Sequence, residues 1–130
     1  MDGQWVVAAG ILMVLHGLIH LMGTTVYMEL GSLEALPYKT TLLGGRWELG
    51  AGGIRVFGAL WLMPAVGFAL AGTALVAGWS WPTLLLVIVT LFSLTLTLLD
   101  WDRAFAGALF NTAILGVVWA GPSIAAWLSE

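Results

Sequence analysis

Cysteine is absent from this chain, and charged residues are scarce: only four Lys or Arg and seven Asp or Glu occur among 130 residues. Without cysteine, disulfides, thiolate metal ligands and cysteine nucleophiles are excluded. Charged residues make up 8% of the chain, whereas soluble domains carry about 25%. Hydrophobic residues make up 61%, which is more apolar surface than a soluble domain of this size can bury. The composition therefore predicts a protein that has the lipid bilayer as its solvent.

A basic patch with interleaved aromatic residues is also missing, and the formal net charge is only −3. The sequence therefore gives no support for a nucleic-acid partner. The Gly-rich segment 50–53 follows no predicted strand and lacks the lysine of a phosphate-binding loop. We expect no nucleotide and no other cofactor from these patterns.

Four long apolar runs account for most of the chain. These runs contain no formally charged residue and cover 5–27, 56–78, 83–99 and 104–128. A helix of about 20 apolar residues crosses a hydrocarbon core of about 30 Å, so each run is interpreted as a membrane-spanning helix. Pro64 predicts a kink near the middle of the second helix. The predicted fold class is all-α, a polytopic membrane protein in which residues 1–130 form one four-transmembrane-helix bundle.

Basic residues occur in only two connections between these runs. The long polar connection 28–55 contains Lys39, Arg46 and Arg55, and the short connection 100–103 contains Arg103. Because basic residues mark the cytoplasmic side of a membrane protein, we expect both connections inside and both termini outside. Within 28–55 three structures stay open: a loop, a lid, or a downward extension of the second helix, with a short interfacial helix at 32–36.

Small residues form two stripes at helical spacing. Thr112, Gly116 and Ala120 form one in the last helix, and Ala65 and Ala69 form the other, with Gly67 nearby, in the second. Small residues let helices approach closely in lipid. We expect both stripes to pack inside the bundle, and a homo-oligomer is the alternative.

Two histidines lie inside the first apolar run. His16 and His20 are four residues apart, so they share one helix face. Such a pair can bind a metal ion, relay a proton or provide an axial haem ligand. Alternatively, each ring forms a hydrogen bond that fixes a neighbouring helix. A metal ion needs further ligands, and the spacing of the nearest acidic residues does not indicate that they converge, so we expect no metal.

Polar residues also follow one face of the third helix. They are Thr90, Ser93, Thr97 and Asp100, with offsets of three, seven and ten positions. Hydroxyl groups in helices often bond back to their own helix, and this interpretation suits Thr90. It accounts less well for a stripe that ends in a carboxylate.

The tetrapeptide 100–103, with the sequence DWDR, places two carboxylates and a guanidinium within one turn. Asn111 follows about two turns into the last helix. Crowded carboxylates with Arg and His neighbours acquire different pKa values, which separates acid and base roles. The alternative is an ordinary salt-bridged membrane surface.

Segment 15–23, LHGLIHLMG, resembles the opening helix of small uncharacterised four-helix bacterial membrane proteins with an HGLIHLxG-like first helix. Segment 58–62, GALWL, and the positions Trp101, Asp102, Gly107 and Asn111 are similar to later parts of that family. There is a weaker likeness to DoxX-like membrane proteins, which share four helices and a Glu before a Gly-rich second helix, here Glu48. The resemblance implies a four-helix fold in a bacterial inner membrane.

The leading hypothesis is a small membrane enzyme that acts on a lipophilic small molecule near the cytoplasmic leaflet. Its chemistry would be general acid–base catalysis, such as isomerisation, hydration or epoxide opening. Asp100 or Asp102 would be the acid or base, and His20 and His16 its partners or proton relay. Arg55 or Asn111 would stabilise the negative charge that develops on oxygen. The candidate substrate-binding residues are Arg55, Asn111, Glu48, Arg46, Arg103 and Thr97.

Two other functions fit the same residues. A non-enzymatic subunit could assist a larger complex, or several copies could form a transporter for protons or a small solute, with Thr97 and Asp100 along the path. A haem or metal protein that uses His16 and His20 is the third hypothesis.

Overall fold

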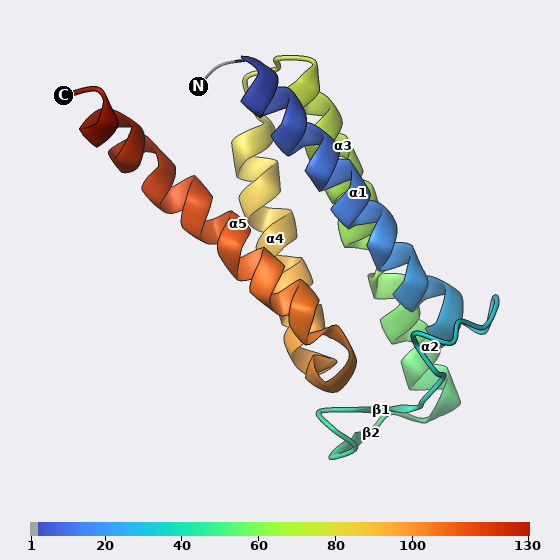
Figure 1. Ribbon diagram of the computed structural model, residues 1–130. Helices are drawn as coiled ribbons and strands as arrows, with labels where there is room; N and C mark the ends of the chain where they lie inside the picture. The colour runs from blue at the N-terminus through green and yellow to red at the C-terminus, as the bar shows by residue number, and fades with distance from the viewer. Residues whose placement is uncertain (1–2) are drawn as a thin grey trace.

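Long helices follow the apolar runs in the computed structural model, which describes residues 3–130 (Figure 1). The elements are α1 (Gly3–Tyr27), β1 (Thr41–Leu42), β2 (Trp47–Glu48), α2 (Gly50–Leu60), α3 (Leu62–Val76), α4 (Pro82–Leu99) and α5 (Trp101–Leu128). Four helices are long and apolar enough to cross a membrane, when α2 and α3 are taken as one. The predicted helical bundle is confirmed, with one small two-stranded sheet added to it.

The second span is broken at Trp61, between α2 and α3. Pro64 has no N–H to donate to the carbonyl group of Leu60, four residues earlier, so the regular helix is interrupted there. The next hydrogen bond, from the amide of Ala65 to the carbonyl oxygen of Trp61, is long at 3.4 Å. The hydrogen bonding of the helix is therefore interrupted next to Pro64, where the sequence predicts a kink. The helix also begins at Gly50, so the last part of the long connection extends it.

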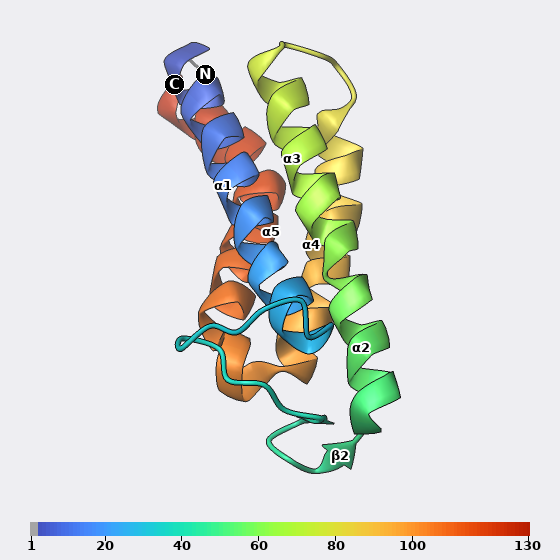
Figure 2. The same ribbon diagram turned by 90° about the vertical axis from the view of Figure 1, so that its right-hand side faces the viewer.

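The last span begins at Trp101, three residues before its predicted start. Its first turn is offset from the rest at Ala104, where φ is −118° and ψ is 20°. Helix α5 packs on α4 and leans away from α1 and α3 toward its C-terminal end (Figure 1). The start of α1 and the end of α5 lie at the same end of the bundle (Figure 2).

The segment 28–49 lies across the opposite end of the bundle (Figure 2). Strands β1 and β2 form an antiparallel hairpin there, in which Leu42 pairs with Trp47. The expected interfacial helix at 32–36 is absent, because this stretch makes a turn closed by a bridge between Leu33 and Leu36. The amide of Leu43 donates to the carbonyl oxygen of Leu99 at 2.9 Å. The segment is therefore docked on the bundle.

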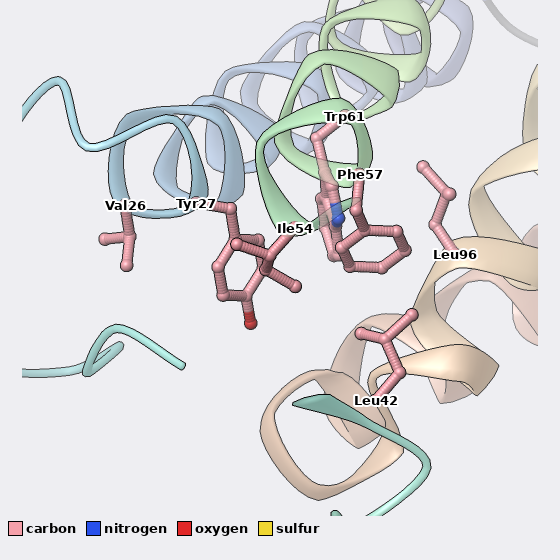
Figure 3. Packing of buried hydrophobic residues seen from close by; sticks show 7 residues of the cluster. All are labelled: Val26, Tyr27, Leu42, Ile54, Phe57, Trp61 and Leu96. Atoms are coloured by element: carbon pink, nitrogen blue, oxygen red, sulfur yellow. The ribbon is translucent and has the colours of Figure 1, made fainter. Parts of the chain in front are cut away.

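A buried apolar cluster holds this docked segment in place. Leu42, 1% exposed, lies among side chains of α1, α2 and α4 (Figure 3). The cluster consists of Val26, Tyr27, Leu42, Ile54, Phe57, Trp61 and Leu96. Of the alternatives for 28–55, the structure shows a docked loop with a hairpin, followed by an extension of the helix.

Glycines bring α1 and α3 into backbone contact. A Cβ on Gly10 would lie 2.6 Å from the carbonyl oxygen of Gly72, and one on Gly17 would lie 2.8 Å from that of Ala65. The expected packing at Ala65 is therefore present. The other expected stripe is not used inside the bundle, because no atom lies within 4 Å of a Cβ built on Gly116. This glycine lies in the part of α5 that leans away.

Candidate functional site

The buried polar side chains lie on faces of α1, α4 and α5 that meet one another. They are His16, His20, Thr24, Thr90, Ser93, Thr97, Asp100 and Asn111, each at most 7% exposed. Buried polar groups in an apolar bundle are costly unless they are hydrogen-bonded. Two clusters of hydrogen bonds satisfy most of them.

The first cluster, here called the histidine ring, links four residues by three contacts between side chains and is closed by a contact to the backbone of His16. A carbonyl oxygen can only accept, so Nδ1 of His20 donates to the carbonyl oxygen of His16 at 2.8 Å. Nε2 of a neutral His20 then accepts from the hydroxyl of Ser93 at 2.6 Å. Ser93 accepts from Nδ2 of Asn111 at 2.8 Å, and Oδ1 of Asn111 accepts from Nε2 of His16 at 3.0 Å. The ring therefore joins α1, α4 and α5.

This arrangement assigns opposite tautomers to the two histidines. His20 carries its proton on Nδ1, and both of its ring nitrogens are occupied. His16 carries its proton on Nε2, and its Nδ1 has no hydrogen-bond partner among residues 3–130. The lone pair of His16 Nδ1 is therefore available to a ligand.

The second cluster surrounds Asp100, at the junction of α4 and α5. Tyr27 donates to one of its carboxylate oxygens. Lys39, from the docked segment, lies 2.6 Å from the other carboxylate oxygen and 3.0 Å from Asp102. Asp100 is 1% exposed, whereas Asp102 is 41% exposed. Asp100 is therefore the buried carboxylate, and Asp102 lies beside it at the surface of the protein.

Burial raises the pKa of Asp100 above its ordinary value, because the charged form loses its water. The hydrogen bonds from Lys39 and Tyr27 favour the charged form and offset part of this rise. A carboxyl group with a raised pKa is suited to exchange a proton closer to neutral pH.

A pocket of about 190 Å³ connects the two clusters and is here called the polar pocket. Its polar wall residues are His16, His20, Thr97, Asp100, Arg103 and Trp61. Ala35 and Leu36 of the docked segment also line it, so this segment covers the pocket. The indole N–H of Trp61 is buried and has no hydrogen-bond partner within residues 3–130. A residue of the pocket wall thus has an unused hydrogen-bond donor.

The structure brings some of the predicted site residues together and leaves others apart. Asn111 belongs to the histidine ring, and Asp102 shares the ion pair of Lys39 with Asp100, but neither lines the pocket. Three further residues belong to neither cluster and do not line the pocket: Arg55, which pairs with Glu29 at 3.4 Å, and the exposed Arg46 and Glu48. Arg55 lies on α2, and the other two lie in the β-hairpin.

Three important residues were missed by the sequence analysis: Tyr27, Lys39 and Trp61. Tyr27 follows His16, His20 and Thr24 on one face of α1, at offsets of four, eight and eleven, so this spacing could have indicated it. Nothing in the sequence indicated Lys39, because its position depends on how the segment 28–49 folds.

A second cavity, of about 440 Å³, lies between α1 and α5 beside the polar pocket. It shares the wall residues Ile19 and Gly107 with that pocket. A larger apolar groove of about 530 Å³ lies between α3 and α4, beside Pro64, and has no polar side chain suited to chemistry. The polar pocket is therefore the candidate site.

No group of three His, Asp or Glu side chains within residues 3–130 is placed to hold a metal ion. Both nitrogens of His20 are already hydrogen-bonded, so a metal ion held by both histidines would have to break the histidine ring.

Comparison with protein-family models, with curated proteins and with solved structures found no match.

Proposed function

We propose that this protein is a small membrane enzyme that binds a lipophilic molecule in the polar pocket and transfers protons within it. The observation that carries this proposal is that His16, Thr97 and Asp100, from three separate helices, line one pocket in an otherwise apolar bundle. Ionisable groups inside a membrane protein are costly and typically mark a functional site. The resemblance to small bacterial membrane proteins supports a bacterial inner membrane, with the covered end of the bundle in the cytoplasm.

Asp100 is the proposed catalytic base. Its carboxylate lines the pocket, and Lys39 and Tyr27 hold it in place. His16 is its proposed partner, because its Nδ1 is unoccupied, whereas His20 has no free nitrogen. In an isomerisation, Asp100 would remove a proton from carbon and return it at another carbon, so that no co-reactant is needed.

The reaction is tested by substituting Asp100→Asn and Asp102→Asn one at a time and following conversion of lipophiles that co-purify with the protein. D100N should abolish turnover, and D102N should retain most of it, because only Asp100 lines the pocket. E48Q is the control outside the pocket. Full activity in a folded D100N variant would contradict the assignment.

The pH dependence of turnover gives a second test. A base works only when deprotonated, so the rate should fall as pH falls through the pKa of Asp100. Because that pKa is raised, the fall should begin at a higher pH than the value of about 3.9 for an unperturbed Asp implies. A rate independent of pH over the acidic range would argue against Asp100 as the base.

An oligomeric pore is less well supported. Thr97 and Asp100 are each 1% exposed and lie within one bundle. Side chains enclosed in this way do not line a channel between copies.

A further inference from the structure

Three cavities follow one another along α1 and α5. The first apolar cavity shares the wall residues Ile19 and Gly107 with the polar pocket. It shares Leu12 and Phe110 with a second apolar cavity of about 230 Å³, farther along both helices. These two cavities are here called the tail groove. The polar pocket and the tail groove are therefore adjoining cavities along the same two helices, and this row of cavities is here called the path.

The length of this path matches one hydrocarbon tail. Along α1 it extends from Gly23 in the polar pocket to Ala9 in the tail groove. These residues are 14 positions apart (23 − 9), which corresponds to about 21 Å of helix. One leaflet of a bilayer is about 15 Å of hydrocarbon. A tail of leaflet length can thus lie in the groove while its head group occupies the pocket.

Polarity changes along the path in one direction. His16 lies where the polar pocket and the tail groove adjoin, since it lines both, and the other residues that line the tail groove are apolar. The charged side chains lie at the other end, next to the docked segment. This order fits an amphiphile whose head points toward Asp100 and whose tail points toward the termini.

The charges at the head-group end balance one another. Asp100 and Asp102 are offset by Lys39 and Arg103, which pair with them at 2.6–3.7 Å. An additional charge brought into this pocket would find no counter-charge, and burying an unpaired charge is costly. A neutral head group can instead accept a hydrogen bond from the unused indole N–H of Trp61.

From these observations we infer that the polar pocket and the tail groove bind a single-tailed lipid with an uncharged, oxygen-bearing head group. This inference rests on the proposed function, since it names the class of molecule on which the pocket acts. A hydroxyl head can donate to Asp100 or to Nδ1 of His16 and accept from Trp61.

Ligand-induced thermal stabilisation of the protein in nanodiscs tests the inference with four probes: hexadecanol, hexadecanoate, hexadecylamine and octanol. A ligand that binds only the folded state raises Tm. Hexadecanol should bind with a Kd at least about tenfold lower than the two charged analogues. Octanol should bind more weakly because its tail fills only part of the groove. Equal stabilisation by all four probes would overturn the inference.

Variants in the tail groove test where the tail lies. Ala113 borders the groove and is exposed, so A113F should fold normally while blocking the groove. A125F is the matched control, because Ala125 is an exposed alanine on the same helix that borders neither cavity. A113F should abolish stabilisation by hexadecanol, and A125F should preserve it. Full stabilisation of A113F would overturn the inference.

W61F tests the head-group contact. It removes the N–H while keeping an aromatic ring, and it should weaken hexadecanol binding by about three- to tenfold, the effect of one hydrogen bond. Unchanged binding would contradict a head group at Trp61. A dimer that A113F converts to a monomer would show that a second copy covers the groove, which also overturns the inference.

The proposed function and this inference can fail separately. If hexadecanol binds as expected but no lipophile is converted by the wild-type protein, the catalytic proposal fails and the ligand class stands. In the opposite outcome, turnover depends on Asp100, A113F is stabilised by hexadecanol as much as A125F, and the charged analogues stabilise the protein as much as hexadecanol. In that case the ligand class fails and the catalytic proposal stands.

Discussion

At the scale of single residues, the histidine ring shows how polar groups are tolerated in an apolar bundle. Each residue of the ring donates to or accepts from the next one, so that four hydrogen bonds connect the four residues. Thr90 differs, since its hydroxyl only donates to the carbonyl oxygen of Leu86 in its own helix. The same helix therefore contains one hydroxyl that links helices and one that does not.

Removing the linking hydroxyl should cost much more than removing the other. S93A leaves Nε2 of His20 without a partner and removes the shorter of the two hydrogen bonds from Nδ2 of Asn111, so it should lower the free energy of unfolding by about 1–3 kcal/mol. T90V keeps the shape of the side chain and leaves no group unpaired, so its effect should be about 0.5 kcal/mol or less. Equilibrium unfolding in detergent measures both. Equal effects would show that the ring does not join the helices.

At the scale of helices and loops, close approach of α1 and α3 depends on glycine. Gly10 faces the backbone of Gly72 so closely that a methyl group has no room. Such contacts drive helix association in lipid, because the apolar side chains gain little by leaving one apolar solvent for another.

Two glycine substitutions with the same chemistry should therefore behave differently. G10A places a methyl group 2.6 Å from the carbonyl oxygen of Gly72 and should destabilise the protein by about 1–3 kcal/mol. G116A meets no atom within 4 Å and should be neutral or stabilising by up to about 1 kcal/mol, because alanine favours helix. The unfolding midpoints of the two variants decide the matter. A tolerated G10A would contradict the backbone contact.

The sequence predicted the helices well because hydrophobic length alone specifies a membrane span. The break between α2 and α3 next to Pro64 could be anticipated, because the missing N–H is a local property. It did not predict the docked segment, since Leu42 and Lys39 find their partners on helices far away in the chain. The stripe at Gly116 failed for a related reason: spacing shows which residues share a face, and not which helix covers that face.

The same distinction applies to the candidate site. The polar faces of α1 and α4 were visible in the sequence, as was the Asp at the end of the second of these faces. Which charged residues of 28–55 would join them was not visible. Lys39 reaches Asp100, whereas Arg55 pairs with Glu29 on the outer surface.

At the scale of the whole molecule, the covering segment and the apolar cluster lie at one end of the bundle (Figures 2 and 3), and the polar pocket adjoins them. The covering segment is held by the ion pairs of Lys39, the hydrogen bond from Leu43 and the burial of Leu42. The segment thereby restricts access to the polar pocket from this end of the bundle, while the tail groove adjoins the pocket between α1 and α5.

Breaking the Lys39 ion pair should loosen this cover. K39A leaves the buried carboxylate of Asp100 without its cation, and such a loss costs more than about 1.4 kcal/mol, so the segment 28–49 should exchange its amide hydrogens at least about tenfold faster. R46A is the control, because Arg46 forms no ion pair among the described residues. Unchanged exchange in K39A would show that other contacts alone hold the cover.

Side chains from three helices meet inside the bundle at the histidine ring, and nitrogen NMR of the two imidazole side chains can detect this meeting. The chain contains only two histidines, so labelling them with nitrogen-15 gives a spectrum that two variants can assign. The account predicts single opposite tautomers, with the proton on Nδ1 of His20 and on Nε2 of His16, and a change at His20 in S93A. If both imidazoles instead show the mixed tautomers of imidazole in water, and S93A changes neither, the side chains of the three helices do not meet in this way.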